Sequence, residues 1–318
     1  MADAKVRLQG SLQAPRCLVL GANGLIGSHV ARQLASRGCA VRAFDRFSGA
    51  GNLQGARGDI EKFTGNYLNA SDVRNSLRGM QFIFHCIHTT TPRESLQKPL
   101  FDAETNILPA VNLLGEAVKA GVGKIIYFSS LAVYGSGPRG MAVKENDKLM
   151  PISPYGVSKF TIEKCIEYFG GIHGIDYAIL RPATTYAEKQ SVLPGTGVAG
   201  NFISNALAKK PVVIYGDGKA VRDIVHAEDI ARGAVEAAFK KHASKVFNLG
   251  TGRGVTLNQL AKMVGGITGS ELRITRLPGR NEVQRLVCDI SRAKRELGWS
   301  PRITLEEGLR RCVEAFSG

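Results

Sequence analysis

The feature that most constrains this chain is the run GANGLIG at residues 21–27, which directly follows an apolar stretch and opens a helical pattern. Glycine at such a turn lets the backbone bend sharply and come close to a pyrophosphate. The helix that follows offers free N–H groups and the positive end of its dipole to an anion. The next apolar stretch, Ala40–Phe44, ends at Asp45, close to the spacing of about 20 residues that suits a ribose-binding acid. This combination predicts a dinucleotide-binding strand–helix–strand unit.

The residue at the end of the second strand also indicates which dinucleotide binds. The Asp45 carboxylate can accept hydrogen bonds from both ribose hydroxyls and would repel a 2′-phosphate, which favours NAD over NADP. Arg46, the next residue, could attract that phosphate and keeps NADP open as an alternative.

Strand and helix patterns alternate through the first half of the chain. Apolar strand segments are predicted at Arg16–Leu20, Ala40–Phe44, Phe82–Phe84, Lys124–Phe128 and Tyr177–Leu180. Helical patterns are predicted at Leu25–Ser36, Leu100–Ala120 and Pro154–Phe169. Such alternation predicts an α/β fold: a doubly wound parallel sheet of the Rossmann type, with helices on both faces.

The pattern changes after Arg181-Pro182, where the elements become shorter and glycine more frequent. We therefore expect a flexible tail at residues 1–14, an NAD-binding domain at 15–182 and a smaller α+β substrate lobe at 183–318. Residues 222–250 are expected to pack back on the first domain. A length of 318 residues agrees with about two domains.

Composition excludes several classes of function. The chain carries 42 basic and 27 acidic residues, but the basic ones occur at most in pairs, so we interpret the net charge of +15 as a solvated surface rather than a nucleic-acid site. No apolar run approaches the roughly 18 residues of a membrane span. The N-terminal segment lacks the apolar core of a signal peptide, so a cytoplasmic location is expected. The six cysteines form no CxxC pair and no zinc-ligand spacing with histidine, so no metal site is expected.

The second chemical signal is Tyr155-x-x-x-Lys159, whose two ends share one face of a helix. The motif is weak alone, but it follows a buried strand that ends in Ser129-Ser130. A nearby ammonium and a cationic nicotinamide would lower the pKa of Tyr155 below its ordinary value of about 10. Tyr155 could then take the proton from a substrate hydroxyl while Ser130 holds the oxygen.

On these motifs the chain resembles the extended short-chain dehydrogenase/reductases, in particular the NAD-dependent sugar-nucleotide epimerase/dehydratase family, with the UDP-glucose 4-epimerases as its nearest subgroup. The resemblance extends over about residues 16 to 315 and rests on GANGLIG, FSSLAVYG, SPYGVSK, LRP, YGDGKAVRDIVHAEDIA, VFNLGTG and RAKRELGW. It implies that Ser130 and Tyr155 contact the sugar hydroxyl, that Lys159 binds the nicotinamide ribose and that Asn106 supports the active-site helix. It also implies a homodimer through the two helices at 100–120 and 154–169.

The catalytic residues predicted in this way are Ser130, Tyr155 and Lys159. The residues predicted to bind the cofactor are Gly21, Asn23, Gly24, Leu25, Ile26, Gly27, Asp45, Arg46, Asn66, Tyr67, Ile87, Tyr155 and Lys159. Those predicted to bind the substrate are His88, Thr89, Ser130, Thr184, Arg222, Arg280 and Leu286.

The chain also departs from the family pattern. Dehydratases and decarboxylases of this family carry one or two acids just after the catalytic serine or threonine, whereas this chain has Leu131 and Ala132, which can supply neither acid nor base for an elimination. Leu286 stands where hexose-restricted relatives carry a bulky tyrosine, so the resemblance implies room for an acetamido group. Residues 87–91, after the fourth strand, read Ile-His-Thr-Thr-Thr where the family has small residues. The resemblance implies that this loop faces the nicotinamide and the sugar, so the identity of the sugar stays open.

The resemblance therefore implies an NAD-dependent enzyme that epimerises C4 of a UDP-sugar by transient oxidation to the 4-keto sugar. UDP-Glc/UDP-Gal, UDP-GlcNAc/UDP-GalNAc and a uronate all remain open as substrates. Two alternatives stay beside it: an NAD(P)-dependent 4-keto sugar-nucleotide reductase, and a non-catalytic nucleotide-sensing or RNA-binding protein on the same fold. The intact set of Ser130, Tyr155 and Lys159 argues against the last.

Overall fold

The structure is a computed structural model that describes residues 14–47, 51–138, 140–188, 197–243, 245–278 and 283–317. The greater part of the expected tail at 1–14 and the predicted substrate residue Arg280 therefore lie outside the described residues. Within these ranges no helix combines the length and the apolar content needed to cross a membrane.

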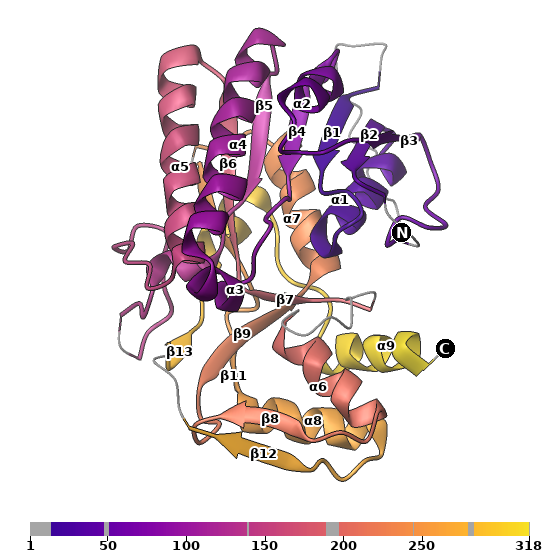
Figure 1. Ribbon diagram of the computed structural model, residues 1–318, viewed down its shortest axis with the longest axis vertical. Helices are drawn as coiled ribbons and strands as arrows, with labels where there is room; N and C mark the ends of the chain where they lie inside the picture. Colours follow the sequence, from indigo (N-terminus) through magenta and orange to yellow (C-terminus); the bar gives the residue numbers. More distant parts are fainter. Residues whose placement is uncertain are drawn as a thin grey trace.

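A seven-stranded, wholly parallel sheet forms the centre of the larger layered part (Figure 1), in the order β10-β6-β5-β4-β1-β2-β3. The order reverses between β1 and β4, which is the switch point where a doubly wound sheet opens a crevice for ligands. The strands are β1 Arg16–Leu20, β2 Ala40–Asp45, β3 Ile60–Thr64, β4 Phe82–His85, β5 Lys124–Phe128, β6 Asp176–Pro182 and β10 Val246–Leu249. The predicted fold class is thus confirmed.

Helices cover both faces of this sheet. On one face α1 (Leu25–Ser36) packs against α7 (Ala227–Phe239), and the apolar residues of both helices share one core with Val19 and Phe84 of the sheet. On the other face lie α2, α4 and α5, over a second core that includes Leu113 and Ile162. Their bounds are α2 Ala70–Leu77, α4 Pro99–Lys119 and α5 Pro154–His173; the short α3 (Pro92–Gln97) precedes α4, and the 3-10 turn η1 (Leu131–Tyr134) follows β5.

The remaining elements form a separate part, here called the C-terminal lobe, below the sheet in Figure 1. Its strands make two small sheets, one in which β9 pairs with β7, β11 and β13, and one of β8 with β12. A third apolar core joins α6, α8 and α9. The bounds are β7 Thr184–Tyr186, α6 Val198–Leu207, β8 Val212–Tyr215, β9 Val221–His226, β11 Gly254–Thr256, α8 Leu257–Thr268, β12 Ile274–Leu277, β13 Arg285–Leu286 and α9 Leu305–Ser317. The π-helical η2 (Ala293–Leu297) is not part of the lobe, because it packs on α7 and β10 in the first core of the larger part.

The chain returns to the central sheet after it has entered the C-terminal lobe. β10 adds to the edge of the sheet beside β6, and α7 packs on α1. β9 does not return with them, because its partners all belong to the lobe. Within residues 222–250, which were expected to pack back on the first domain, α7 and β10 therefore lie against the central sheet, whereas β9 pairs within the C-terminal lobe.

Candidate active site

The turn between β1 and α1 is built for close approach of an anion. Gly21 has φ +78°, and a Cβ on Gly27 would stand 2.0 Å from the Gly21 carbonyl oxygen. Both positions therefore require glycine. No side chain caps the N-terminus of α1, whose N-cap is Gly24, so the first N–H groups of the helix remain available to a phosphate. The residues present fit the pyrophosphate of a dinucleotide.

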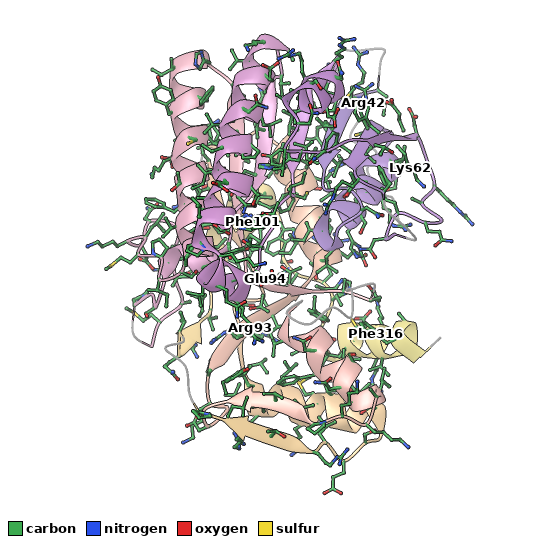
Figure 2. All side chains as sticks on the ribbon, in the orientation of Figure 1. Arg42, Lys62, Arg93, Glu94, Phe101 and Phe316 are labelled. Atoms are coloured by element: carbon green, nitrogen blue, oxygen red, sulfur yellow. The ribbon has the colours of Figure 1, made fainter. Side chains whose placement is uncertain are left out.

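A cavity of about 480 Å³ lies over this turn and the ends of β2 and β3. Asp45 reaches it from the end of β2, where Oδ2 accepts a hydrogen bond from the Asn23 N–H (2.9 Å) and Oδ1 accepts one from the Arg46 N–H (2.8 Å). Each carboxylate oxygen keeps a further lone pair for a ribose hydroxyl. The side chain of Phe101 from α4 forms part of the wall (Figure 2). The predicted cofactor residues that line this cavity are Gly21, Asn23, Gly24, Asp45, Arg46, Asn66, Tyr67 and Ile87.

A second cavity, of about 610 Å³, continues from the first toward the C-terminal lobe. The two cavities share four lining residues, Asn23, Gly24, Cys86 and His88, so they form one continuous trough. The second cavity is lined by the predicted residues Leu25, Ile26, His88, Ser130, Tyr155, Lys159, Thr184, Arg222 and Leu286. The trough thus brings the dinucleotide turn and the predicted substrate residues together.

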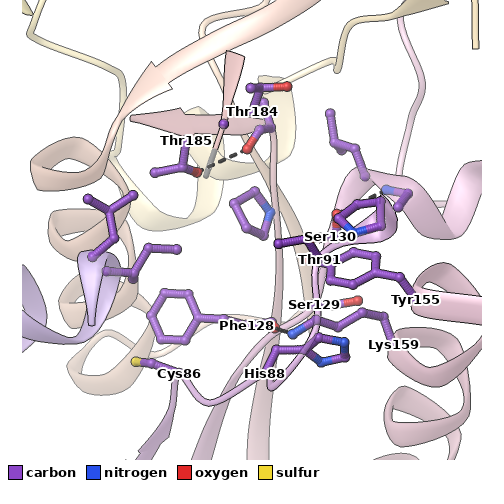
Figure 3. A pocket seen from close by; sticks show the side chains of 18 of the residues that line it. Cys86, His88, Thr91, Phe128, Ser129, Ser130, Tyr155, Lys159, Thr184 and Thr185 are labelled. Atoms are coloured by element: carbon purple, nitrogen blue, oxygen red, sulfur yellow. Dashed lines mark hydrogen bonds between the residues drawn. The ribbon is translucent and has the colours of Figure 1, made fainter. Parts of the chain in front are cut away.

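The three predicted catalytic residues meet on one wall of the second cavity (Figure 3). Ser130 follows β5 as the N-cap of η1, where its Oγ accepts a hydrogen bond from the Ala132 N–H (3.1 Å). Tyr155 lies in the first turn of α5, and its N–H donates to Ser95 Oγ (3.1 Å). One turn later, the buried Nζ of Lys159 donates to the Phe128 carbonyl (2.7 Å) and lies 5.8 Å from the centre of the Tyr155 ring.

Burial controls the proton affinity of this pair. Burial raises the pKa of Tyr155 to about 12, although the interaction with Ser130 acts in the opposite direction. Burial also lowers the pKa of Lys159 to about 7. The sequence predicted that an ammonium and a bound cationic nicotinamide together lower the pKa of Tyr155. In the cofactor-free protein the pKa is raised instead, because removal of the phenol from water outweighs the neighbouring groups.

A buried polar network holds the strand end that carries the serines. Arg181 of β6 forms a two-pronged ion pair with Glu163 of α5 (3.0 and 2.7 Å), and Glu163 also accepts a hydrogen bond from Ser129 Oγ. Arg181 further donates to Tyr134 Oη (2.8 Å), which donates to Asn248 Oδ1 (2.8 Å). The network ties β5, β6, β10, η1 and α5 together around Ser129 and Ser130.

Some residues lie elsewhere than the sequence suggested. Thr89 lines the cofactor cavity rather than the second cavity. Asn106 supports the loop after β4 rather than the active-site helix, because its Oδ1 accepts from the Thr89 N–H (2.9 Å) and its Nδ2 donates to the Asp102 carbonyl (2.8 Å). Gly27 lies beneath the turn and lines neither cavity.

Sequence reasoning also missed several residues of the trough. Asn52, Cys86, Pro92, Phe128 and Thr185 line the second cavity. Cys86 and Pro92 flank the 87–91 loop after β4 at the switch point, so the topology itself could have indicated them. Thr90 and Thr91 of that loop, which was expected to face the ligands, line the second cavity as well. Asn52 comes from the loop after β2, where no sequence pattern pointed to a ligand. No group of three or more His, Cys, Asp and Glu side chains is placed to hold a metal ion in the part of the chain that the structure describes.

Comparison with known proteins gives this geometry a context. The NAD dependent epimerase/dehydratase family matches residues 17–250. The UDP-glucose 4-epimerase of Mycolicibacterium smegmatis is 31% identical over 311 residues, which cover 95% of this chain and 98% of that protein. Among solved structures, the UDP-glucose 4-epimerase of Thermotoga maritima with UDP-glucose has a TM-score of 0.89 and 34% identity, covering 95% of this chain and 98% of the other. The UDP-N-acetylglucosamine 4-epimerase of Methanobrevibacter ruminantium in complex with UDP-N-acetylmuramic acid has a TM-score of 0.88 and 27% identity, with 96% and 99% covered.

Proposed function

The chain belongs to the NAD-dependent epimerase/dehydratase family, and we propose that it is a UDP-sugar 4-epimerase. The observation that carries this proposal is the position of Ser130, Tyr155 and Lys159 on one wall of a cavity that continues into the dinucleotide cavity. Leu131 and Ala132 also line that cavity where an elimination would need an acid and a base. The chemistry available is therefore oxidation and reduction at a carbinol carbon, without loss of water or carbon dioxide.

Each residue has a definite role in this reaction. When bound, NAD supplies reversible acceptance of a hydride. Tyr155 acts as the phenolate, which the positive charge of a bound nicotinamide would favour. Its Oη takes the proton of the sugar 4-hydroxyl as the C4–H bond breaks, which leaves a 4-keto sugar. Ser130 holds the oxygen through this change of charge. After the 4-keto sugar has turned its other face toward the cofactor, C4 regains the hydride on that face and Tyr155 returns the proton to the oxygen. Lys159 would hold the nicotinamide ribose throughout.

Different residues of the trough would bind the dinucleotide and the sugar nucleotide. Asp45 and the turn at 21–27 would hold the dinucleotide, whereas Arg222 would bind the diphosphate of the sugar nucleotide. Leu286 and Thr184 would face the sugar. The lobe that contributes these last residues is the substrate lobe in this proposal, with its boundary at residue 182.

A panel of UDP-sugars with NMR detection of products tests the proposal. We expect interconversion at C4 without net consumption of NAD, and NAD that stays with the protein through gel filtration. Arg46 lines the cofactor cavity and favours a second candidate, a 4-keto sugar-nucleotide reductase that uses NADPH. Stoichiometric oxidation of NADPH, with no epimerisation of any sugar, would support the reductase instead.

We also propose that the protein is a cytoplasmic homodimer formed through α4 and α5. The two helices pack side by side along one edge of the molecule (Figure 1). They expose large apolar side chains that a monomer would leave in water, namely Leu100, Leu108, Val111, Tyr168 and Ile172.

A further inference from the structure

A carboxylate without a cationic partner lies directly behind the catalytic helix. Asp102 of α4 is completely buried. It accepts hydrogen bonds from the hydroxyls of Thr90 and Ser158, and a longer one from Asn106 Nδ2 (3.4 Å). Among the described residues, no lysine or arginine lies within ion-pair distance of it. A buried carboxylate that is held by neutral donors and has no cationic partner is a candidate for a functional group.

His88 lies between this carboxylate and the catalytic tyrosine. Its Nε2 is 3.4 Å from Asp102 Oδ1, and its side chain is only 8% exposed. Its ring meets Tyr155 edge to face, with 4.5 Å between ring centres and 74° between planes. Both ring nitrogens are shielded from solvent and lack a well-formed hydrogen bond, so the contact with Asp102 is a long, electrostatic one. Figure 3 shows His88 beside Tyr155 and Lys159.

The loop that carries His88 is fixed at both ends. Asn106 holds its start through the Thr89 N–H. At its end Thr91 and Glu94 form a capping box, in which Glu94 Oε2 accepts from the Thr91 N–H (2.8 Å) and Thr91 Oγ1 accepts from the Glu94 N–H (3.2 Å). The imidazole therefore has a defined place against Tyr155.

The titratable groups that face His88 come from three elements: Tyr155 and Lys159 from α5, Asp102 from α4, and His85 from β4. Burial and then Lys159 lower the pKa of His88 to about 4, against the opposing effect of Asp102, so the imidazole is neutral at neutral pH. Burial raises the pKa of Asp102, but the electrostatic contact with His88 and the hydrogen bonds from Ser158 and Thr90 outweigh it and bring the value to about 2. The pair is thus a neutral ring beside a permanent anion.

We propose that His88 and Asp102 are positioning residues for Tyr155 and Lys159. His88 fixes the plane of the Tyr155 ring, and Asp102 supplies a buried negative charge that raises the proton affinity of both Tyr155 and Lys159. This inference rests on the proposed function. It would explain why His88 stands where the family has a small residue, and why Asp102 is buried without a cationic partner.

The substitution Asp102→Asn tests the charge while it keeps the size of the side chain. Loss of a nearby negative charge lowers the proton affinity of every neighbouring group, so both limbs of the pH profile of kcat should move to lower pH by about one unit. Glu116→Gln is the matched control, because Glu116 is a buried acid of the same helix that pairs with Arg74 and Lys119, away from the trough. Its profile should coincide with that of the parent.

The role of His88 is tested by measuring kcat and KM separately, because a positioning residue affects kcat more than KM. His88→Ala should lower kcat about tenfold with little change in KM, and His88→Phe should recover most of the loss because an aromatic edge is restored against Tyr155. Equal kcat values in the parent and both variants would overturn the positioning role. This pair of variants decides the matter even if Asp102→Asn does not fold.

A readout that needs no turnover separates this inference from the proposed function. Protein labelled with ¹³C at the tyrosine Cζ is titrated by NMR with and without NAD, and the Tyr155 signal is identified by its loss in Tyr155→Phe. Asp102→Asn should shift the Tyr155 titration to lower pH by about one unit. A parent inactive on every UDP-sugar would defeat the proposed function alone, whereas unchanged titration in Asp102→Asn would defeat the inference alone.

Discussion

Leu286 of β13 lies in register with Arg222 of β9, and both residues line the second cavity. Arg222 Nη1 donates to the carbonyls of Val221 (3.0 Å) and Val283 (2.7 Å), so its guanidinium is held close to the chain that leads into β13. A diphosphate bound at Arg222 would therefore place the attached sugar within reach of Leu286. The apolar side chain at this position, rather than a charged one, would set the size of the sugar that fits.

The first prediction concerns that size. Leucine lacks the ring and hydroxyl of tyrosine, so the parent should act on UDP-GlcNAc/UDP-GalNAc, whether or not it also accepts UDP-Glc/UDP-Gal. Leu286→Tyr should lower kcat/KM for the N-acetylated pair by about 10- to 100-fold, since size selection in an apolar pocket amounts to about 1–3 kcal/mol. Both substrate pairs are compared in parent and variant. A parent inactive on N-acetylated sugars, or a variant with unchanged preference, would remove Leu286 from sugar recognition.

The second prediction concerns the acid–base residue. Tyr155→Phe should retain binding of NAD and UDP-sugar but lower kcat by about 10²-fold or more, because the proton of the 4-hydroxyl loses its acceptor. The measurements are kcat by a coupled assay and the two dissociation constants by calorimetry. Tyr168→Phe, on the exposed face of the same helix, is the control. Near-normal turnover in Tyr155→Phe would refute the assigned role.

The third prediction concerns cofactor choice. Asp45→Asn removes the charge at the end of β2 but keeps an acceptor for the Asn23 N–H. We expect weaker NAD binding, by about tenfold for the loss of charged hydrogen bonds to the ribose, and measurable NADP binding as the repulsion of the 2′-phosphate disappears. Dissociation constants for both cofactors check this. If the variant binds NAD and NADP with the same affinities as the parent, Asp45 does not bind the ribose hydroxyls.

The sequence was most informative where structure is decided locally. The bounds of β1, α1 and β5 agree with prediction, because glycine turns and short apolar runs mark them. The edge strand β3 was not predicted, since its residues IEKFT are only partly buried and carry no apolar run. Edge strands of this kind are shaped by pairing with their neighbour, here β2, rather than by their own composition.

In the candidate site, too, local motifs could be predicted from the sequence, and contacts between distant segments could not. Ser130, Tyr155 and Lys159 were found because their motif is local, and the structure places them on one wall of one cavity. The contact of His88 with Asp102 joins two segments that only the packing of α4 against the sheet brings together. The raised pKa of Tyr155 in the cofactor-free protein could not be predicted from the motif either, because burial depends on the whole fold.

The fourth prediction concerns assembly. Leu108→Glu places a charge on the exposed face of α4, where leucine is 64% exposed in one chain. Because burial of that charge in an interface would be costly, the variant should be monomeric while the parent is a dimer. Light scattering after gel filtration measures both masses. Leu277→Glu, an exposed apolar position on β12 of the C-terminal lobe, is the control and should leave the mass unchanged. A monomeric parent would contradict the proposed dimer.

The last prediction uses the burial of Lys159 to link stability with pH. Lys159 is only 4% exposed, and burial lowers its pKa to about 7, against an ordinary value of about 10.4 in the unfolded chain. Between these two values the unfolded chain binds a proton at Lys159 that the folded chain does not, so the parent loses stability as the pH falls.

The substitution Lys159→Met removes this penalty along with the proton site. The free energy of unfolding of the variant, relative to the parent, should therefore rise as the pH is lowered from about 10 to about 7, by up to a few kcal/mol. Urea denaturation without NAD at several pH values measures it. Lys164→Met, an exposed lysine of the same helix, controls for the loss of a lysine. The variant should be inactive even where it is more stable, because the ribose of the nicotinamide loses its ligand. Parallel stability curves for Lys159→Met and the parent would show that Lys159 keeps its proton in the fold.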